Sequence, residues 1–132
     1  MIQIQAASGE PIYIQIIEQI KKLVLKQVLQ PGDKLPSVRE LALLITANPN
    51  TVSKAYKELE QEQVVVTIKG SGTFVNDFKT KEANQSLVQD ELARLKSSVL
   101  ALQFLGLPEE ECKDHVGRFY ADNRKEDGHA SN

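Results

Sequence analysis

The stretch SVRELALLITANPNTVSKAY, residues 37–56, decides the fold because it carries the signals of two short helices and of the turn between them. Ser37 followed by Glu40 has the form of a capping box, in which each side chain binds the other residue's backbone N–H. Asn48 followed by Pro49 has the form of a second helix start, an N-cap and a first helical residue. The stretch therefore predicts two helices joined by a four-residue turn.

A longer helix is predicted before this pair and a β-hairpin after it. Apolar residues recur in steps of three and four between Pro11 and Pro31, which predicts an amphipathic helix with a wide buried face. Residues 64–68 are β-branched throughout and predict a strand, and a glycine turn separates them from a second short strand at residues 73–75. A hairpin of this size is barely stable alone, so it must pack on the helices.

Three helices followed by a hairpin define a mainly α fold, a winged helix-turn-helix domain that we expect to span residues 1–78. Residues 79–132 are expected to form a short two-helix C-terminal arm with a frayed end. The predicted core is the set of apolar positions with helical spacing: Tyr13, Ile16, Ile17, Ile20, Leu23, Val24, Val28, Leu41, Ala42, Leu44, Ile45, Val52, Ala55, Tyr56 and Leu59.

This arrangement predicts binding to double-stranded DNA. A helix that begins at Asn48 can place its N-terminal side chains against base edges in the major groove. The same helix end carries a positive dipole and free N–H groups, which favour a phosphate nearby. The hairpin tip, residues 69–72, offers backbone N–H groups and one cation to the flanking DNA backbone or minor groove. The sequence thus indicates a sequence-specific DNA-binding transcription regulator.

The arm has the pattern of a helix that pairs with another helix. Its apolar residues follow one another at spacings of 4, 3, 4 and 3, which is a heptad seam. Pro108 begins a second helix with Phe119 on its apolar side. One chain cannot bury both faces of such an arm, so a homodimer is expected, which also matches a palindromic operator. The predicted dimer interface consists of Val88, Leu92, Leu95, Val99, Leu102 and Phe119.

Composition excludes several other classes of protein. The 132 residues include 16 basic and 18 acidic side chains, a net charge of −2, so coating nucleic acid through bulk charge is excluded. A single cysteine excludes an internal disulfide framework and a cysteine-rich zinc site. No apolar run approaches the length of a membrane span, and the start is not a secretory signal, so we expect a cytoplasmic protein. No catalytic pair, metal site or cofactor motif is present in the sequence, so an enzyme is not expected.

Several motifs also resemble one known family. Pro11-Ile12-Tyr13, PGDKLPSVRELA at residues 31–42, NTVSKAY at residues 50–56 and GSGTFV at residues 70–75 look like the GntR family of bacterial transcription regulators. The resemblance covers roughly residues 10–78. The tail is too short for the large effector domains of that family and is similar to the small helical dimerisation arm of its YtrA subfamily.

We expect a repressor that occludes its promoter, and the resemblance implies that the target is often an operon for an ABC-type transporter. It also implies a set of DNA contacts at the start of the second helix, along the third helix and at the wing: Ser37, Arg39, Asn48, Asn50, Thr51, Ser53, Lys54, Tyr56, Lys69 and Gly70. Pro49 and Ser53 stand where the family often carries arginine, so strong guanine recognition from those two positions is not expected. Gln27 and Gln63 stand where glycine is common, and a positive φ there would strain them.

Some interpretations stay open at the level of sequence. The winged helix could serve protein contacts alone, in which case Arg39→Ala would be tolerated and salt-dependent DNA binding absent. Tyr56 could belong to the core or reach a phosphate. The apolar seam could enclose a cavity for an unidentified small-molecule effector. Cys112 and His115 are more typical of packed and surface residues than of a redox or metal sensor.

Overall fold

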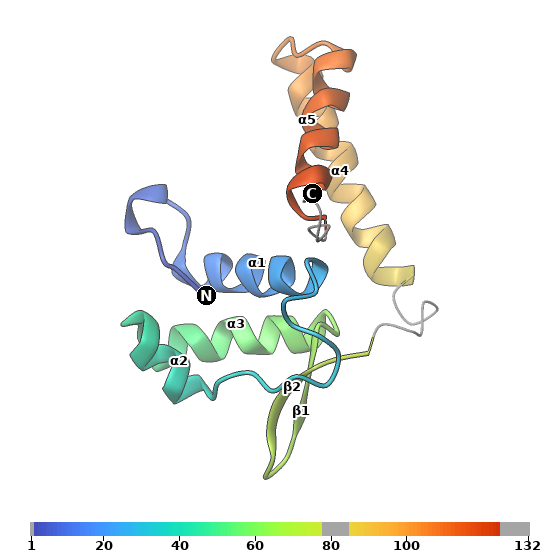
Figure 1. Ribbon diagram of the computed structural model, residues 1–132. Helices are drawn as coiled ribbons and strands as arrows, with labels where there is room; N and C mark the ends of the chain where they lie inside the picture. Colours follow the sequence, from blue (N-terminus) through green and yellow to red (C-terminus); the bar gives the residue numbers. More distant parts are fainter. Residues whose placement is uncertain (1, 78–84, 125–132) are drawn as a thin grey trace, which may run out of the picture. The chain divides into compact units, whose positions relative to one another are not determined.

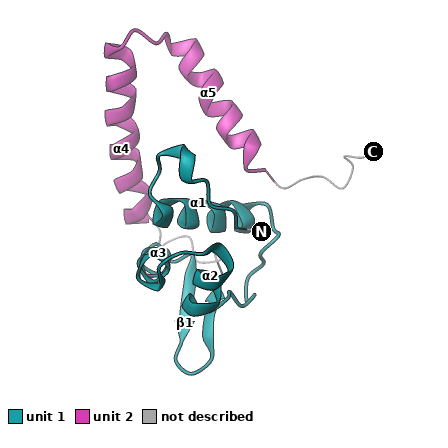
Figure 2. Cartoon of the chain, turned by 90° about the vertical axis from the view of Figure 1, so that its left-hand side faces the viewer, with its two compact units in different colours: residues 1–78 teal, residues 79–132 magenta. Residues whose placement is uncertain are grey.

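The computed structural model describes residues 2–77 and 85–124, and the chain forms two compact units, residues 1–78 and 79–132 (Figure 2). The first unit contains the 3-10 turn η1 (Ala6–Ser8), the helices α1 (Ile12–Leu25), α2 (Val38–Ile45) and α3 (Pro49–Gln61), and the strands β1 (Val65–Ile68) and β2 (Gly72–Val75). The second unit contains α4 (Gln85–Phe104) and α5 (Glu109–Asp122). This order confirms the predicted mainly α winged-helix fold with a two-helix arm.

The central helix of the first unit is α3, on which α1, α2 and β1 all pack (Figure 1). Ile16, Ile20, Val52 and Leu59 are at most 1% exposed and form the middle of the core. β1 and β2 pair antiparallel, with Val65 opposite Val75, and both of these residues are buried against the helices. The hairpin therefore gains its stability from the helical core, as its short strands require.

Both predicted helix starts are present. Ser37 Oγ accepts from the backbone N–H of Glu40 at 3.1 Å, and Glu40 Oε1 accepts from the backbone N–H of Ser37 at 2.9 Å. Asn48 Oδ1 accepts from the N–H of Asn50 at 2.8 Å, and Pro49 is the first helical residue. The turn between α2 and α3 is one residue shorter than predicted, since only the three residues 46–48 lie between the two helices.

Two predicted core positions are wrong. α1 ends at Leu25, because Gln27 adopts a φ of 61° that a helix cannot continue, and Val28 beyond it is 60% exposed. Leu29 packs against the core instead. Leu44 is 74% exposed, because Leu41, Ala42 and Ile45 already cover the side of the eight-residue α2 that faces α3.

A third extended segment completes the wing. The N–H of Leu35 donates to the carbonyl of Thr73 at 2.8 Å, the N–H of Gly32 donates to the carbonyl of Val75 at 2.9 Å, and the N–H of Val75 donates to the carbonyl of Asp33 at 2.8 Å. The residues that lead into α2 therefore pair with β2. This pairing connects the wing directly to the residues that precede α2.

Residues 2–10 lie along α1 and are held there by hydrogen bonds, a feature that the sequence did not suggest. We call these residues the N-terminal strap. Gln15, at 7% exposure, accepts from the N–H of Gln5 at 2.8 Å and donates to the carbonyls of Gln5 and Glu10 and to Ser8 Oγ. Gln19 pairs in the same way with both backbone groups of Gln3. The two glutamine side chains, one helical turn apart, thus bond the backbone of the strap as a neighbouring strand would. Ile2 and Ile4 of the strap pack against the core.

We expect Gln15→Ala to destabilise the domain by about 2–3 kcal/mol, because it removes four part-buried hydrogen bonds made by a buried side chain. The urea unfolding midpoint of the purified chain measures this loss. Gln19→Ala is the matched control, since its bonds to Gln3 are exposed and water can replace them, and we expect a cost below about 1 kcal/mol. Equal midpoints for the two variants would contradict the anchoring role of Gln15.

Among the residues that the structure describes, three other than glycine have a positive φ: Gln27 at 61°, Thr46 at 54° and Gln63 at 64°. The left-handed conformation is unfavourable for side chains with a Cβ, and more so for a β-branched residue such as Thr46. The strain anticipated at Gln27 and Gln63 is therefore real. It is held in place by the hydrogen bonds that end α1 and α3, such as the one from the N–H of Val64 to the carbonyl of Leu59 at 2.9 Å.

Gln63→Gly is expected to stabilise the domain by about 1 kcal/mol, because glycine adopts this φ without strain. The gain corresponds to a rise of several degrees in Tm by calorimetry. Gln61→Gly, in the last turn of α3, serves as the control and is expected to lower Tm, because glycine is unfavourable inside a helix. A lower Tm for Gln63→Gly would mean that its side chain contributes more than the backbone strain costs.

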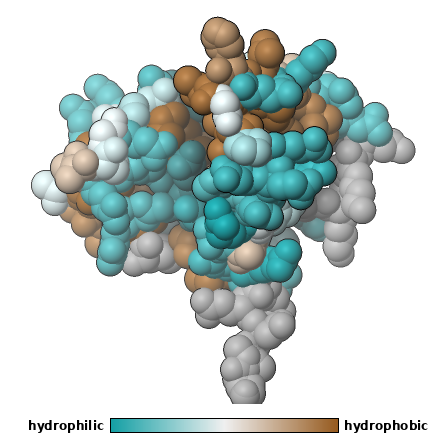
Figure 3. Space-filling model, turned by 90° about the horizontal axis from the view of Figure 1, so that it is seen from above, coloured by the Kyte–Doolittle hydropathy of each residue, from teal (hydrophilic) through white to brown (hydrophobic). Residues whose placement is uncertain are grey.

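The arm consists of two helices that diverge from the turn joining them (Figure 2). Neither α4 nor α5 has a buried residue, and the acidic first turn of α5, residues 109–111, suits its helix dipole. Apolar side chains reach the surface of the chain next to polar ones, brown beside teal in Figure 3. Of the helices in residues 2–77 and 85–124, none combines the length and apolar character needed to span a bilayer.

Candidate nucleic-acid interface

The start of α2 presents Ser37 and Arg39 to solvent. Ser37 is fixed by the capping box, which uses its Oγ as an acceptor, so its hydroxyl hydrogen remains available to a phosphate. The hydrogen bond from the backbone of Ser37 lowers the pKa of Glu40, with the Ser37 side chain contributing next. Glu40 is therefore a carboxylate occupied within the cap. Arg39 extends from the first turn of α2, beside this cap.

The start of α3 carries small polar side chains and the positive end of a helix dipole, both of which favour a polyanion nearby. Asn48 and Asn50 are exposed and Thr51 is half-buried, all at the positive end of the helix dipole. The cap occupies only Oδ1 of Asn48, so the cap does not use its amide N–H groups. Pro49 removes one N–H from this end of the helix. Small polar side chains at the exposed, positive end of a helix suit close approach to DNA.

Farther along α3, one outer face carries cations. Lys54 and Lys57 are exposed and Ser53 is half-buried, on the side of the helix away from Val52 and Leu59. Lys57 was not among the predicted contacts, although its spacing of seven residues from Asn50 puts both on one face of a helix. Lys54 Nζ lies 3.9 Å from the centre of the Tyr13 ring of α1.

Tyr56 takes the structural role that the sequence left open. Its side chain is 6% exposed, and its hydroxyl donates to the carbonyl of Pro36 at 2.6 Å. Burial, with the charge of Glu40 adding to it, raises the pKa of Tyr56 to about 12. The hydroxyl hydrogen is thus committed to the loop that precedes α2. This bond fixes the distance between that loop and α3, and a phosphate contact would have to break it.

The wing tip places Lys69 and Gly70 in solvent. The N–H of Ser71 donates to the carbonyl of Ile68 at 2.9 Å, and Gly70 has a φ of 80°, which explains why glycine stands there. At Gly72, a Cβ would come within 2.8 Å of Lys34 Cε. The Lys34 side chain therefore lies across the wing, so a second cation joins Lys69 on the hairpin.

The residues predicted to form a dimer interface lie exposed on the arm. Val88, Leu92, Leu95 and Phe119 are each 48–59% exposed, and Leu102 is 36% exposed. Val99 is half-buried. An apolar groove of about 630 Å³ opens between α4 and α5, with Leu95, Val99, Leu102, Leu107 and Val116 among its lining residues. These apolar surfaces have no cover within the described part of the arm.

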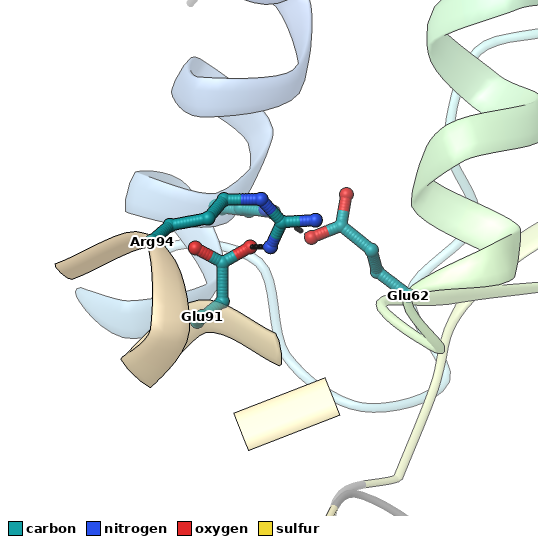
Figure 4. A network of polar contacts seen from close by, with 4 residues as sticks. Glu62, Glu91 and Arg94 are labelled. Atoms are coloured by element: carbon teal, nitrogen blue, oxygen red, sulfur yellow. Dashed lines mark hydrogen bonds and ion pairs between the residues drawn. The ribbon is translucent and has the colours of Figure 1, made fainter. Parts of the chain in front are cut away.

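Polar side chains surround this apolar surface. Glu91 and Arg94 form an ion pair along α4 (Figure 4). Lys113 Nζ pairs with Glu109 Oε2 at 2.9 Å on α5, and this pair lowers the pKa of Glu109 and raises that of Lys113. Cys112 is half-buried and lines the groove, and Arg118 contacts His115 Nδ1 at 3.1 Å. Within residues 2–77 and 85–124, no three His, Cys, Asp or Glu side chains gather where they could hold a metal ion.

Known proteins resemble this chain along most of its length. Residues 12–75 match the family of bacterial regulatory proteins named gntR. The chain is 45% identical over 126 residues to the HTH-type transcriptional repressor YtrA of Bacillus subtilis, a match that covers 92% of this chain and 94% of that protein. It is 39% identical to the uncharacterized HTH-type transcriptional regulator YhcF of the same organism, over 87% of this chain and 94% of that one.

A solved structure has the same architecture. The protein described as a transcriptional antiterminator from Listeria monocytogenes EGD-e superimposes with a TM-score of 0.89 at 41% identity, over 96% of this chain and 95% of that chain. These likenesses confirm the resemblance that the motifs suggested, and they confirm a transcription regulator rather than an enzyme. The chain belongs to the gntR family of bacterial regulatory proteins, in its YtrA subfamily.

Proposed function

We propose that this chain is a cytoplasmic repressor that binds a palindromic DNA operator as a homodimer. The observation that carries the proposal is the exposed start of α3, capped by Asn48, together with the exposed Arg39 in the first turn of α2 and the exposed Lys69 at the wing tip. A helix of this kind fits the major groove, and a hairpin tip beside it reaches the DNA backbone or minor groove. The repressor name of the relative YtrA supports the same function.

The proposed contacts fall into two kinds. Asn50, Thr51 and Ser53 are at the end of α3 that would face base edges and are the candidates for sequence recognition. The other contacts would position the protein on phosphates and consist of Ser37, Arg39, Asn48, Lys54, Lys69 and Gly70, joined by Lys57 and Lys34. Tyr56 is left out because its hydroxyl is already bound to Pro36. Five of the proposed phosphate contacts are cations, so a chain with a net charge of −2 can still present local positive charge to DNA.

The homodimer rests on the apolar surface of the arm. α4 has no buried residue, although its apolar side chains follow a heptad seam. Exposed apolar faces of this size are unfavourable in water, and a second copy of the same seam would cover them. Two joined DNA-binding units would then meet the two halves of a palindrome. The resemblance to YtrA adds the proposal that the regulated operon encodes an ABC-type transporter.

Binding of the purified chain to DNA from its own promoter region tests the function. Fluorescence anisotropy at 50 and 200 mM salt should give tight binding that weakens steeply as salt rises, since lysine and arginine displace counterions from phosphates. An unrelated DNA of equal length is the control for specificity. Equal affinity for both DNAs, or no binding at low salt, would contradict the proposal and favour a winged helix that contacts proteins only.

A further inference from the structure

The Lys54 ammonium of the proposed recognition helix lies on an aromatic ring supplied by another helix. Its Nζ is 3.9 Å from the centre of the Tyr13 ring. Cations attract the face of such a ring when they lie within about 6 Å of its centre. The ion pairs found in residues 2–77 and 85–124 involve Lys21, Arg94 and Lys113 and do not include Lys54. The ring is therefore the specific partner of this cation in that part of the chain.

The Tyr13 ring is held in place by its packing against the core. Tyr13 lies in the first turn of α1, is half-buried and packs against the core formed by residues such as Ile16 and Ile17. Lys54, in contrast, is exposed on the outer face of α3. A free lysine side chain has many rotamers, and contact with a phosphate has to select one of them at an entropic cost. A ring on one side of the ammonium restricts those rotamers before DNA arrives.

We propose that Tyr13 is a positioning residue for DNA binding, which holds the Lys54 ammonium at the outer face of α3 where it meets an operator phosphate. The ring covers one side of the ammonium and leaves N–H groups on the other side for the phosphate oxygens. Tyr13 need not touch DNA itself. The inference rests on the proposed function and adds α1 to the elements that determine operator affinity.

The first test needs no DNA. In NMR spectra of the full chain, the ε protons of Lys54 should be shifted upfield by the ring current of Tyr13. Tyr13→Leu should remove this shift, and Tyr13→Phe, which keeps the ring, should retain it. Lys57, exposed on the same helix, supplies the reference resonance. An unshifted Lys54 resonance in the wild-type chain would overturn the proposal, because the ring would then not hold the ammonium in solution.

The second test is a double-mutant cycle on operator affinity. Tyr13→Leu and Lys54→Met should each weaken binding by about three- to tenfold per half-site. The double variant should bind no more weakly than Lys54→Met, because the ring acts only through the lysine. Lys54→Met should also lower the slope of log affinity against log salt by about one per half-site, while Tyr13→Leu should keep the wild-type slope. Tyr13→Phe should rescue the affinity lost in Tyr13→Leu.

These measurements separate the failure of the inference from other failures. Additive losses in the double variant, or wild-type affinity for Tyr13→Leu, would overturn the positioning role while leaving the operator-binding function intact. Failure of the wild-type chain to bind its promoter DNA would overturn the proposed function and the positioning role together. Circular dichroism and Tm of each variant identify any that fails to fold. The affinity of Tyr13→Phe then still decides whether the ring or the hydroxyl of Tyr13 contributes to DNA binding.

Discussion

Arg39→Ala is expected to weaken operator binding by roughly 30-fold or more. Loss of one arginine contact to DNA costs about 1–3 kcal/mol, and a two-fold dimer would lose that contact in both half-sites. Arg39 is exposed in the first turn of α2, next to a capping box that fixes the backbone from which it extends. The variant should fold normally, because none of the core residues is touched. Anisotropy at 50 and 200 mM salt measures the affinity and its salt dependence.

Arg94→Ala is the matched control, because it removes the same charge from an exposed position of α4. Its ion pair with Glu91 is on the surface and contributes little to stability. A loss confined to Arg39→Ala places that residue at the interface. A reduced salt slope with equal weakening on all DNA sequences would indicate a phosphate contact, whereas a loss of discrimination at one base pair would indicate a base contact. Unchanged binding would remove Arg39 from the site.

The helix starts could be predicted from sequence because they depend on residues close together in the chain. Ser37 with Glu40 and Asn48 with Pro49 each form their caps within four residues. Cap chemistry of this kind needs no knowledge of the tertiary fold. The backbone strain at Gln27 and Gln63 was predicted instead from the family resemblance, since glycine is common at both positions, and their φ values confirm it.

The failures come from contacts between distant parts of the chain. The strap is held by Gln15 and Gln19, and neither glutamine has a local pattern that reveals a backbone partner 10 or 16 residues away. Leu44 has the right spacing for a buried face, but α2 is short and packs on one side only, so packing overrides the pattern. Lys57 could have been found, because it continues the face begun by Asn50. The contact between Lys54 and Tyr13 required the structure, since it joins two helices.

Leu95→Glu is expected to convert the proposed dimer into a monomer and to weaken binding to the full palindrome by at least about 100-fold. Leu95 is in the middle of the heptad seam, is 50% exposed and lines the groove between α4 and α5. A carboxylate there would be buried opposite the same carboxylate of a second copy, which is strongly unfavourable. Two linked DNA-binding units gain about 10²–10⁴ in affinity over one unit, and separation of the units forfeits that gain.

Ser97→Glu adds the same charge to α4 two residues later, on the side of the helix away from the seam, and should remain dimeric. Sedimentation velocity gives the oligomeric state, and anisotropy compares the full palindrome with a single half-site. Because Leu95→Glu leaves residues 1–78 unaltered, its affinity for one half-site should equal that of the wild-type unit. A dimeric Leu95→Glu variant would exclude the seam as the interface. A monomeric variant that still binds the palindrome with wild-type affinity would mean that each unit binds independently, and the arm would then need another role.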